Sequence, residues 1–368
     1  MFTMKKIQRA PETMSAKERV IRTFHYEKTD RVTIGYNANP GIHARLMAEL
    51  GASNEEELLQ ILGVDYRNIW APYTGPQLFA VPKGREVNQL EGCIMRKVEH
   101  PTGYYWDFCD FPLQDADDED FYNFPIPNPD HFNYDQALEK VKSYEGKYGL
   151  YIGHPGVPDI INSNGRLMGM EDVLCHLLIG NEAALDFIRR RSAFQLGMME
   201  RLLDKCKGNI DFMWLGEDLG TQIAPMISLD LYRSILKPIH KQFADLANAY
   251  GIPSIMHTCG CSSWVYEDFI EIGIKGVDTL QPEAVNMSPA YLTEHFGGRL
   301  NFRGCISTAG PLAYGTAQEV RETCRETLDI MMKHGGYHFA PTHEIQDNTP
   351  AENVIAMYQA AHDFGRYE

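Results

Sequence analysis

Short runs of apolar and β-branched residues recur along the chain, and most are followed by a longer stretch whose apolar residues have helical spacing. The runs predict eight β-strands, at residues 31–35, 66–70, 149–153, 211–216, 253–257, 276–280, 300–304 and 336–341. Amphipathic helices are predicted at residues 41–50, 55–62, 170–206, 228–250, 262–272, 289–296, 317–334 and 350–364. This alternation, repeated eight times, is typical of a parallel (β/α)8 TIM barrel of the α/β class, and a doubly wound open sheet is the alternative.

One interval interrupts the alternation after the second strand, at about residues 71–147, and it is rich in proline, glycine, aspartate and aromatic residues. Within it, residues 89–99 and 103–108 predict a β-hairpin, and we expect the insertion to lie over the barrel mouth as a partial lid. Its acidic run at 115–120 is interpreted as a solvated loop rather than a metal site. No linker or low-complexity segment divides the chain, so residues 1–368 are predicted to form a single domain.

The charge of the chain narrows its possible partners. The 368 residues include 34 basic and 50 acidic side chains, for a formal net charge of -16. Binding to nucleic-acid phosphates needs a basic face, so no nucleic-acid partner is expected. No apolar stretch approaches the ~20 residues of a membrane helix, and residues 1–10 lack the apolar core of a signal peptide, so we expect a cytoplasmic protein. The cysteines are too sparse for a disulfide scaffold.

The sharpest chemical motif is His257-Thr258-Cys259, at the end of the fifth predicted strand, where a barrel carries its functional residues. Residues two apart in an extended segment point the same way, so the imidazole and the thiol share one side. With a third donor from another strand end, they predict a zinc site that keeps one position open. The expected third ligand is His343, because the fifth and eighth strands face each other across a barrel, and Cys261 and Cys305 are the alternatives.

Other polar residues stand at the same strand ends. Glu217 and Asp218, after the fourth strand, are candidate catalytic residues that could act as a general base, a fourth ligand or an orienter of a ligand imidazole. A carboxylate that only caps the following loop is the alternative. The candidate substrate-binding residues are Asn37, Asn39, Gln222 and Gln281.

Four motifs in the sequence are similar to those of a known family. They are Gly216-Glu217-Asp218-Leu219-Gly220-Thr221-Gln222, His257-Thr258-Cys259-Gly260, Arg303-Gly304-Cys305-Ile306-Ser307 and Asn348-Thr349-Pro350. Together they resemble the uroporphyrinogen decarboxylase superfamily over roughly residues 15–365. The resemblance implies a (β/α)8 barrel, in agreement with the strand count.

Two features of the sequence distinguish which branch of that superfamily the chain resembles. The decarboxylases carry an arginine-rich motif after the first strand to hold the acidic side chains of a porphyrinogen, whereas residues 35–41 contain no arginine, so decarboxylation of a porphyrinogen is not expected. The His-x-Cys motif is instead similar to the zinc-dependent methylcobamide:coenzyme M methyltransferases, in which His, Cys and a later Cys bind the ion. Pro341-Thr342-His343 places His343 where those proteins have the later cysteine.

What the resemblance implies is a zinc-dependent methyltransferase. Such an enzyme moves a methyl group between a corrinoid (cobamide) held by a partner protein and a small thiol or methylated substrate, so the implied cofactors are Zn2+ and a methylcobamide. Its barrel mouth must admit the corrinoid, which implies a docking rim. The alternatives are a metal-free decarboxylase or lyase acting on a small carboxylated substrate, with Glu217 or Asp218 as the acid group, and a corrinoid-binding protein without catalytic activity.

Overall fold

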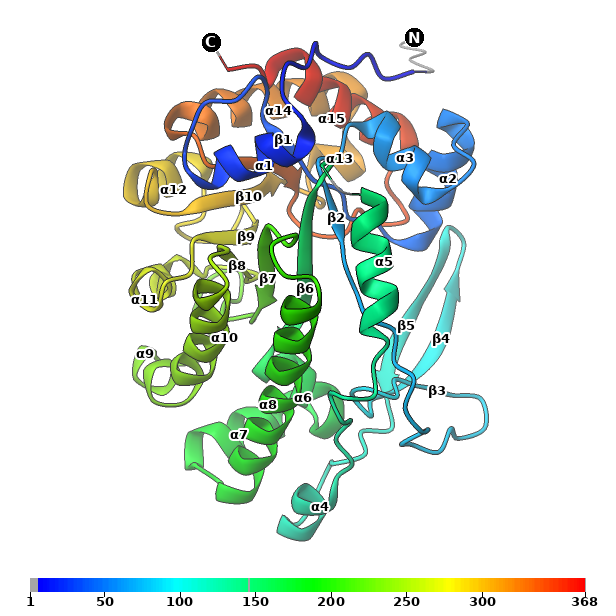
Figure 1. Cartoon of the computed structure of the whole chain (residues 1–368), viewed down its shortest axis with the longest axis vertical. Helices are drawn as coiled ribbons and strands as arrows, with labels where there is room; N and C mark the ends of the chain where they lie inside the picture. Colours follow the sequence, from blue (N-terminus) through cyan, green and yellow to red (C-terminus); the bar gives the residue numbers. More distant parts are fainter. Residues whose placement is uncertain (1–5, 145, 368) are drawn as a thin grey trace.

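Eight parallel strands form a nearly closed barrel, so the predicted fold class is confirmed (Figure 1). The strands are β1 (Thr33–Ile34), β2 (Tyr66–Asn68), β6 (Gly149–Pro158), β7 (Phe212–Gly216), β8 (Ser254–His257), β9 (Gly276–Leu280), β10 (Asn301–Ile306) and β11 (Tyr337–Pro341). Their order is β1-β11-β10-β9-β8-β7-β6-β2, and each of them lies within or across a predicted strand. The computed structural model describes residues 6–144 and 146–367. The prediction that residues 1–10 are not a signal peptide falls partly on residues 1–5, which lie outside these ranges.

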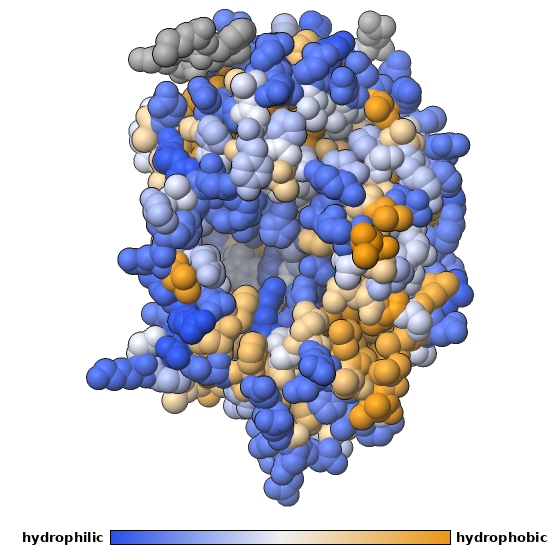
Figure 2. All heavy atoms as spheres, turned by 180° about the vertical axis from the view of Figure 1, so that it is seen from behind, coloured by the Kyte–Doolittle hydropathy of each residue, from blue (hydrophilic) through white to orange (hydrophobic). Residues whose placement is uncertain are grey.

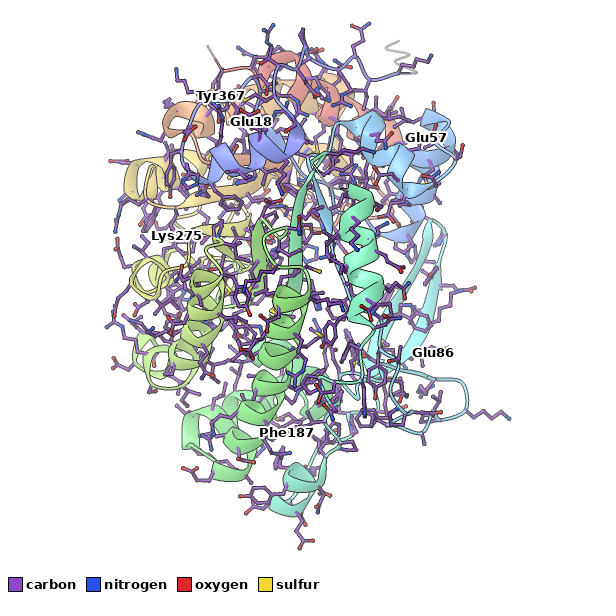
Figure 3. All side chains as sticks on the ribbon, viewed as in Figure 1. Glu18, Glu57, Glu86, Phe187, Lys275 and Tyr367 are labelled. Carbon is purple, nitrogen blue, oxygen red and sulfur yellow. The ribbon has the colours of Figure 1, made fainter. Side chains whose placement is uncertain are left out.

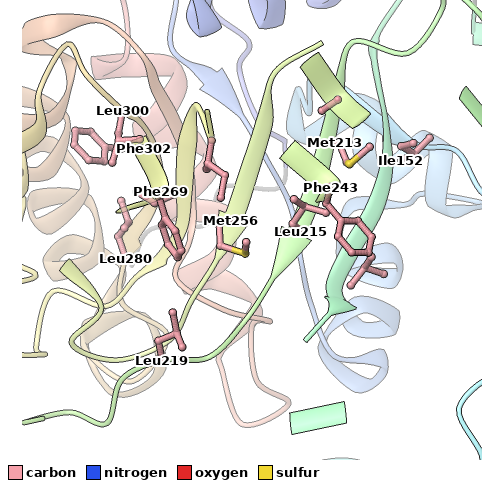
Figure 4. Close-up of a cluster of buried hydrophobic side chains, with 14 of the residues drawn as sticks. Ile152, Met213, Leu215, Leu219, Phe243, Met256, Phe269, Leu280, Leu300 and Phe302 are labelled. Carbon is pink, nitrogen blue, oxygen red and sulfur yellow. The ribbon is translucent and has the colours of Figure 1, made fainter. Parts of the chain in front are cut away.

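Helices pack around the outside of the strands. They are α2 (Pro40–Leu50), α3 (Glu55–Leu62), α5 (Tyr134–Tyr144), α6 (Ile160–Met168), α7 (Met170–Ile179), α8 (Glu182–Lys205), α9 (Leu229–Leu231), α10 (Lys237–Ala249), α11 (Tyr266–Ile272), α12 (Pro289–Phe296), α13 (Pro311–Tyr314), α14 (Ala317–Met331) and α15 (Ala351–Phe364). Outward side chains of the strands, such as Met213 and Met256, share one buried cluster with Phe243 of α10 and Phe269 of α11 (Figure 4). Across the described residues, every helix is too short or too polar to span a lipid bilayer.

Two helix predictions need correction. The sequence predicts one helix over residues 170–206, but the chain forms α7 and α8. Gly180 ends α7 in the left-handed conformation (φ 69°), and the Asn181 side chain accepts a hydrogen bond from the Ala184 amide to begin α8. Helices α5, α6 and α1 (Ala16–Phe24) are not among the predicted ones.

An aromatic layer fills the amino-terminal half of the barrel. The rings of Tyr66 on β2 and Phe212 on β7 both point into the barrel, where they pack edge to face with their centroids 5.4 Å apart. Helix α1 closes this end, because Val20 and Phe24 belong to the same buried cluster as Tyr66, Phe212 and Trp214. The interior is therefore packed at this end.

The insertion contains the predicted hairpin but does not line the barrel cavity. Strands β4 (Ile94–His100) and β5 (Gly103–Cys109) pair antiparallel, with β3 (Glu86–Val87) beside them. The acidic run is partly helical rather than a loop, because Asp117 caps α4 (Asp118–Asn123). All the residues that line the cavity at the mouth come from outside 71–147. The end of the hairpin lies against the loop after β11, where His100 Nε2 is 3.9 Å from Asp347 Oδ2, and a partial lid over the mouth stays a prediction.

The barrel seam between β1 and β2 depends on a buried ion cluster. Strands β1 and β2 are the two ends of the sheet order, and the Asp65 amide donates one backbone hydrogen bond to Ile34. The fully buried Asp65 carboxylate accepts hydrogen bonds from Arg19 Nη1 (2.6 Å), Arg31 Nη1 (2.7 Å) and the Ile34 amide (2.8 Å). Asp65 therefore connects helix α1, strand β1 and the start of strand β2.

We expect Asp65→Asn to lower the free energy of unfolding by about 2–3 kcal/mol, because it removes the anion shared by two buried guanidinium groups, each of which keeps one other carboxylate, Asp30 or Glu12. Urea unfolding followed by circular dichroism measures the change. The control is Asp245→Asn, which removes an exposed ion pair with Lys241 at 2.6 Å and is expected to cost less than about 0.5 kcal/mol. Equal effects of the two substitutions would contradict the role of Asp65 at the seam.

Candidate metal centre

A polar cavity of about 440 Å³ opens at the carboxyl ends of the barrel strands. Its lining comes from residues within or just after each of the eight barrel strands, so it occupies the place where a (β/α)8 barrel carries its active site. A hollow bordered mostly by hydrophilic residues is visible on the face shown in Figure 2. The cavity walls include charged, amide and imidazole side chains, and two of the imidazoles, His257 and His343, form a cluster with the neighbouring Cys259.

His257, Cys259 and His343 converge at this cavity. One ligand atom from each of the three residues lies within 4.8 Å of the others. His257 Nε2 and Cys259 Sγ are 3.5 Å apart, and the His257 and His343 ring centroids are 5.7 Å apart. Bond lengths of ~2.05 Å for Zn–N and ~2.3 Å for Zn–S place tetrahedral N and S ligands about 3.6 Å apart. The donor set and its spacing therefore fit a zinc ion with one position left open.

The chain after β8 turns sharply and so keeps Cys259 beside His257. His257 is the last residue of β8, and the intervening Thr258 points into the protein, where its hydroxyl accepts a hydrogen bond from the Leu219 amide (3.3 Å). Gly260 adopts φ 71°, and a Cβ there would lie 2.2 Å from the Gly220 carbonyl oxygen. Only glycine fits this turn, which ends the extended segment and directs Cys261 away from the cluster.

Asp278 orients the His257 ring. Its Oδ2 is 3.0 Å from His257 Nδ1, and its Oδ1 accepts a hydrogen bond from Arg303 Nη1 at 2.6 Å. Burial opposes ionisation of Asp278, but the Arg303 guanidinium and the His257 imidazole lower its pKa to about 2. When the carboxylate accepts a hydrogen bond from Nδ1–H, the Nε2 lone pair is left for the cluster, as in metal-binding histidines.

Arg303 forms the floor of the cavity. It is buried, donates a hydrogen bond from Nε to the Tyr66 hydroxyl (2.8 Å) and contacts Asn37 Oδ1 through Nη2. Its guanidinium carbon lies 4.4 Å from the centre of the Trp214 ring. Arg303 therefore links the aromatic layer of the barrel to the Asp278–His257 pair.

Asp218 borders the cluster on another side. Its Oδ1 accepts a hydrogen bond from the Cys259 amide (2.8 Å) and lies 3.7 Å from His257 Nε2, and its Oδ2 accepts one from Asn162 Nδ2 (2.8 Å). Burial and the Asp218 carboxylate raise the pKa of the Cys259 thiol. A bound metal ion would overcome this effect, because coordination removes the thiol proton.

Glu217 lies behind the cavity rather than in it. The side chain is fully buried, and its carboxylate accepts hydrogen bonds from the Ile160 and Ile161 amides at 2.7 and 2.9 Å. His240 Nε2 is 3.1 Å from the same carboxylate. Glu217 therefore caps the amino terminus of α6, which follows β6, rather than the loop that follows its own strand β7.

The other predicted site residues are dispersed. Asn37 lines the cavity, whereas Asn39 directly precedes α2 and its side-chain amide donates a hydrogen bond to Gln346 Oε1 (3.3 Å). Gln281 accepts a hydrogen bond from the Gly260 amide (2.7 Å) and one from Gln222 (3.3 Å), so the two glutamines brace the turn after β8.

The two rival ligands lie apart from the cluster. Cys305 adopts φ 66° in β10, and both Cys305 and Cys261 pack in the hydrophobic core between strands and helices. Neither belongs to a potential metal-ligand group within the described residues.

Several cavity residues escaped the sequence analysis as site residues. Asp278 and Arg303 are charged residues within otherwise apolar strands, a pattern that could have identified them. Thr279 adopts φ 63°, unusual for a β-branched residue, and its hydroxyl bonds to the His257 ring. Asp159 also has positive φ (44°), and its Oδ1 has no hydrogen-bond partner among the described residues. Burial and the Glu217 carboxylate raise the pKa of Asp159.

Comparison with known proteins supports the resemblance. Residues 217–364 match the family model described as uroporphyrinogen decarboxylase (URO-D), and this part contains His257, Cys259 and His343. The resemblance is thus confirmed for the second half of the chain. A solved methyltransferase from Methanosarcina mazei aligns with a TM-score of 0.65 and 16% sequence identity, covering 95% of this chain and 99% of that chain. At this identity the likeness shows a common fold. No curated protein matches the chain.

Proposed function

We propose that this protein is a zinc-dependent methyltransferase that exchanges a methyl group between a corrinoid held by a partner protein and a small thiol or methylated substrate. The observation that carries the proposal is the His257–Cys259–His343 cluster at the mouth of a uroporphyrinogen decarboxylase-like barrel. The structural likeness to a protein named methyltransferase supports the same reaction class. Bound zinc would supply Lewis acidity to the sulfur or heteroatom of the small substrate.

The side chains around the cluster have separate tasks in this proposal. His257, Cys259 and His343 would hold the ion, and Asp278 would fix the His257 ring so that Nε2 faces it. The Asp218 carboxylate lies near the Cys259 amide and His257, where it would limit the net positive charge of the centre. With a single thiolate among three protein ligands, the centre would be more electrophilic than one with two thiolates.

The rim of the mouth supports docking of a second protein. Ile223, Val285 and Tyr314 follow β7, β9 and β10, and their exposed fractions of 79%, 48% and 78% are high for such side chains. The Val285 amide donates a hydrogen bond to the Gln222 carbonyl (3.1 Å), so the first two loops lie side by side. Large exposed apolar side chains at one site are typical of protein-interaction surfaces. An acidic chain with net charge -16 would use such contacts rather than a basic patch.

The two carboxylates predicted to act in the lyase alternative are poorly suited to it. Burial raises the pKa of Glu217 to about 8, but this side chain caps the amino terminus of α6 and does not line the cavity. Asp218 does line the cavity, but its pKa is lowered, because His257 and the Cys259 amide outweigh burial, and a group that stays ionised is a poor general acid.

We expect purified protein to bind one zinc ion, and His257→Ala, Cys259→Ala and His343→Ala each to lose it. Plasma emission spectrometry after dialysis measures the metal, and a thiolate-to-cobalt absorption band in the Co2+-substituted protein reports Cys259. His343→Cys is expected to keep zinc while altering turnover, and Cys305→Ala is the control that should keep both. Full zinc content in Cys259→Ala would contradict the site.

Asp278→Asn is expected to weaken zinc binding by about 10- to 100-fold, because the ring partner of a metal-binding histidine contributes on that scale. A competition titration with a chromophoric chelator measures the affinity. Thermal unfolding of the metal-free variant serves as the control for folding. Unchanged zinc affinity would show that Asp278 does not position His257.

The methyl transfer itself is tested with methylcobalamin, cob(I)alamin and a panel of thiols and methylated compounds. We expect a change in the corrinoid absorption spectrum with at least one compound, and its loss in Cys259→Ala, because the small substrate must be activated at the cluster. The outcome against the proposal is a spectrum that stays constant with every compound while a carboxylated substrate is decarboxylated.

A further inference from the structure

A second cavity lies beside the barrel mouth, between α8 and the insertion. It has a volume of about 40 Å³, and its walls are mainly aromatic, aliphatic and proline side chains. Trp70 and Phe194 of the walls both stack near Phe132, with ring centroids 6.4 and 6.1 Å away. His154 lines both this cavity and the larger one, so the two are neighbours. The methyltransferase proposal assigns no role to this space.

The notable residue of the second cavity is Arg191, on α8. Arg191 is 91% buried, yet its Nη1 has no hydrogen-bond partner among the residues that the structure describes. Its guanidinium carbon lies 5.5 Å from the ring centre of Phe187, which Figure 3 labels where α8 meets the insertion. Glu91, the acidic residue of the cavity, favours the charged form of Arg191 but forms no ion pair with it within 4 Å, and it lies 4.0 Å from Arg166 and 3.6 Å from Cys93 Sγ.

The other buried arginines of this protein show what Arg191 lacks. Arg19 and Arg31 share Asp65, and Arg303 pairs with Asp278. A guanidinium group remains charged in proteins, and a buried charge without a counter-ion is costly. Arg191 therefore has the character of a group that receives its anion from outside the chain.

The side chains that line the cavity and its volume indicate the chemical class and the size of the anion that would fit. A carboxylate matches the forked donors of a guanidinium group, and the aromatic walls suit a short apolar body. One water needs about 10–15 Å³ of such volume, so the space admits a few heavy atoms. We infer that this cavity binds a short-chain aliphatic carboxylate through Arg191.

Calorimetric titration of the purified protein with propionate tests this inference, with propionamide as the neutral probe of equal shape. We expect propionate to bind and propionamide not to bind. Arg191→Gln should weaken propionate binding at least tenfold, and Arg191→Lys should weaken it less. Arg189→Gln, which removes an exposed arginine on the same helix, is the matched control and should bind like the natural protein.

Two further measurements separate this site from a structural role and from the metal centre. Without ligand, Arg191→Gln should unfold at a temperature no lower than Arg189→Gln, because it removes an unpaired buried charge. His257→Ala should retain propionate binding. The inference is overturned if the natural protein fails to bind propionate, if Arg191→Gln binds it equally well, if Arg191→Gln alone unfolds at a lower temperature, or if His257→Ala abolishes binding.

Discussion

The Asp278 carboxylate is the interaction on which the mouth of this barrel depends. One oxygen accepts a hydrogen bond from Arg303 and the other faces His257, so a single side chain connects the packed aromatic half of the barrel with the cluster above it. The pairing with Arg303 also keeps Asp278 ionised in a fully buried position. Without that charge, the His257 ring would lose its preferred proton position and with it the orientation of Nε2.

The acidic residues at and behind the mouth have different roles, because each has different hydrogen-bond partners. Asp278 orients a ring, Asp218 binds the amide of Cys259, and Glu217 caps a helix. Asp159 is the carboxylate whose Oδ1 remains without a partner among the described residues, and it lines the cavity. Neighbouring carboxylates in one site thus have different pKa values, because each has a different set of donors around it.

The sequence predicted those parts of the protein that depend on local patterns. Each barrel strand follows from an apolar run, and His257 and Cys259 follow from a two-residue spacing at a strand end. The break between α7 and α8 was missed because it depends on one glycine conformation within a continuous apolar pattern. Asp278 and Arg303 stand out as charges within apolar strands, but their pairing is a contact between β9 and β10, which spacing along the chain does not reveal. The same holds for Arg191, whose lack of a partner is a property of packing.

The seam between β1 and β2 has a mechanical consequence. Other neighbouring strands are joined by ladders of backbone hydrogen bonds, whereas here side chains supply most of the connection: Asp65 at the closed end and Arg303, through Tyr66 and Asn37, near the mouth. The barrel is therefore closed along this seam by buried polar and charged side chains rather than by a backbone ladder. A single substitution can weaken the closure here, whereas the backbone hydrogen bonds of the other strand pairs do not depend on which side chains the strands carry.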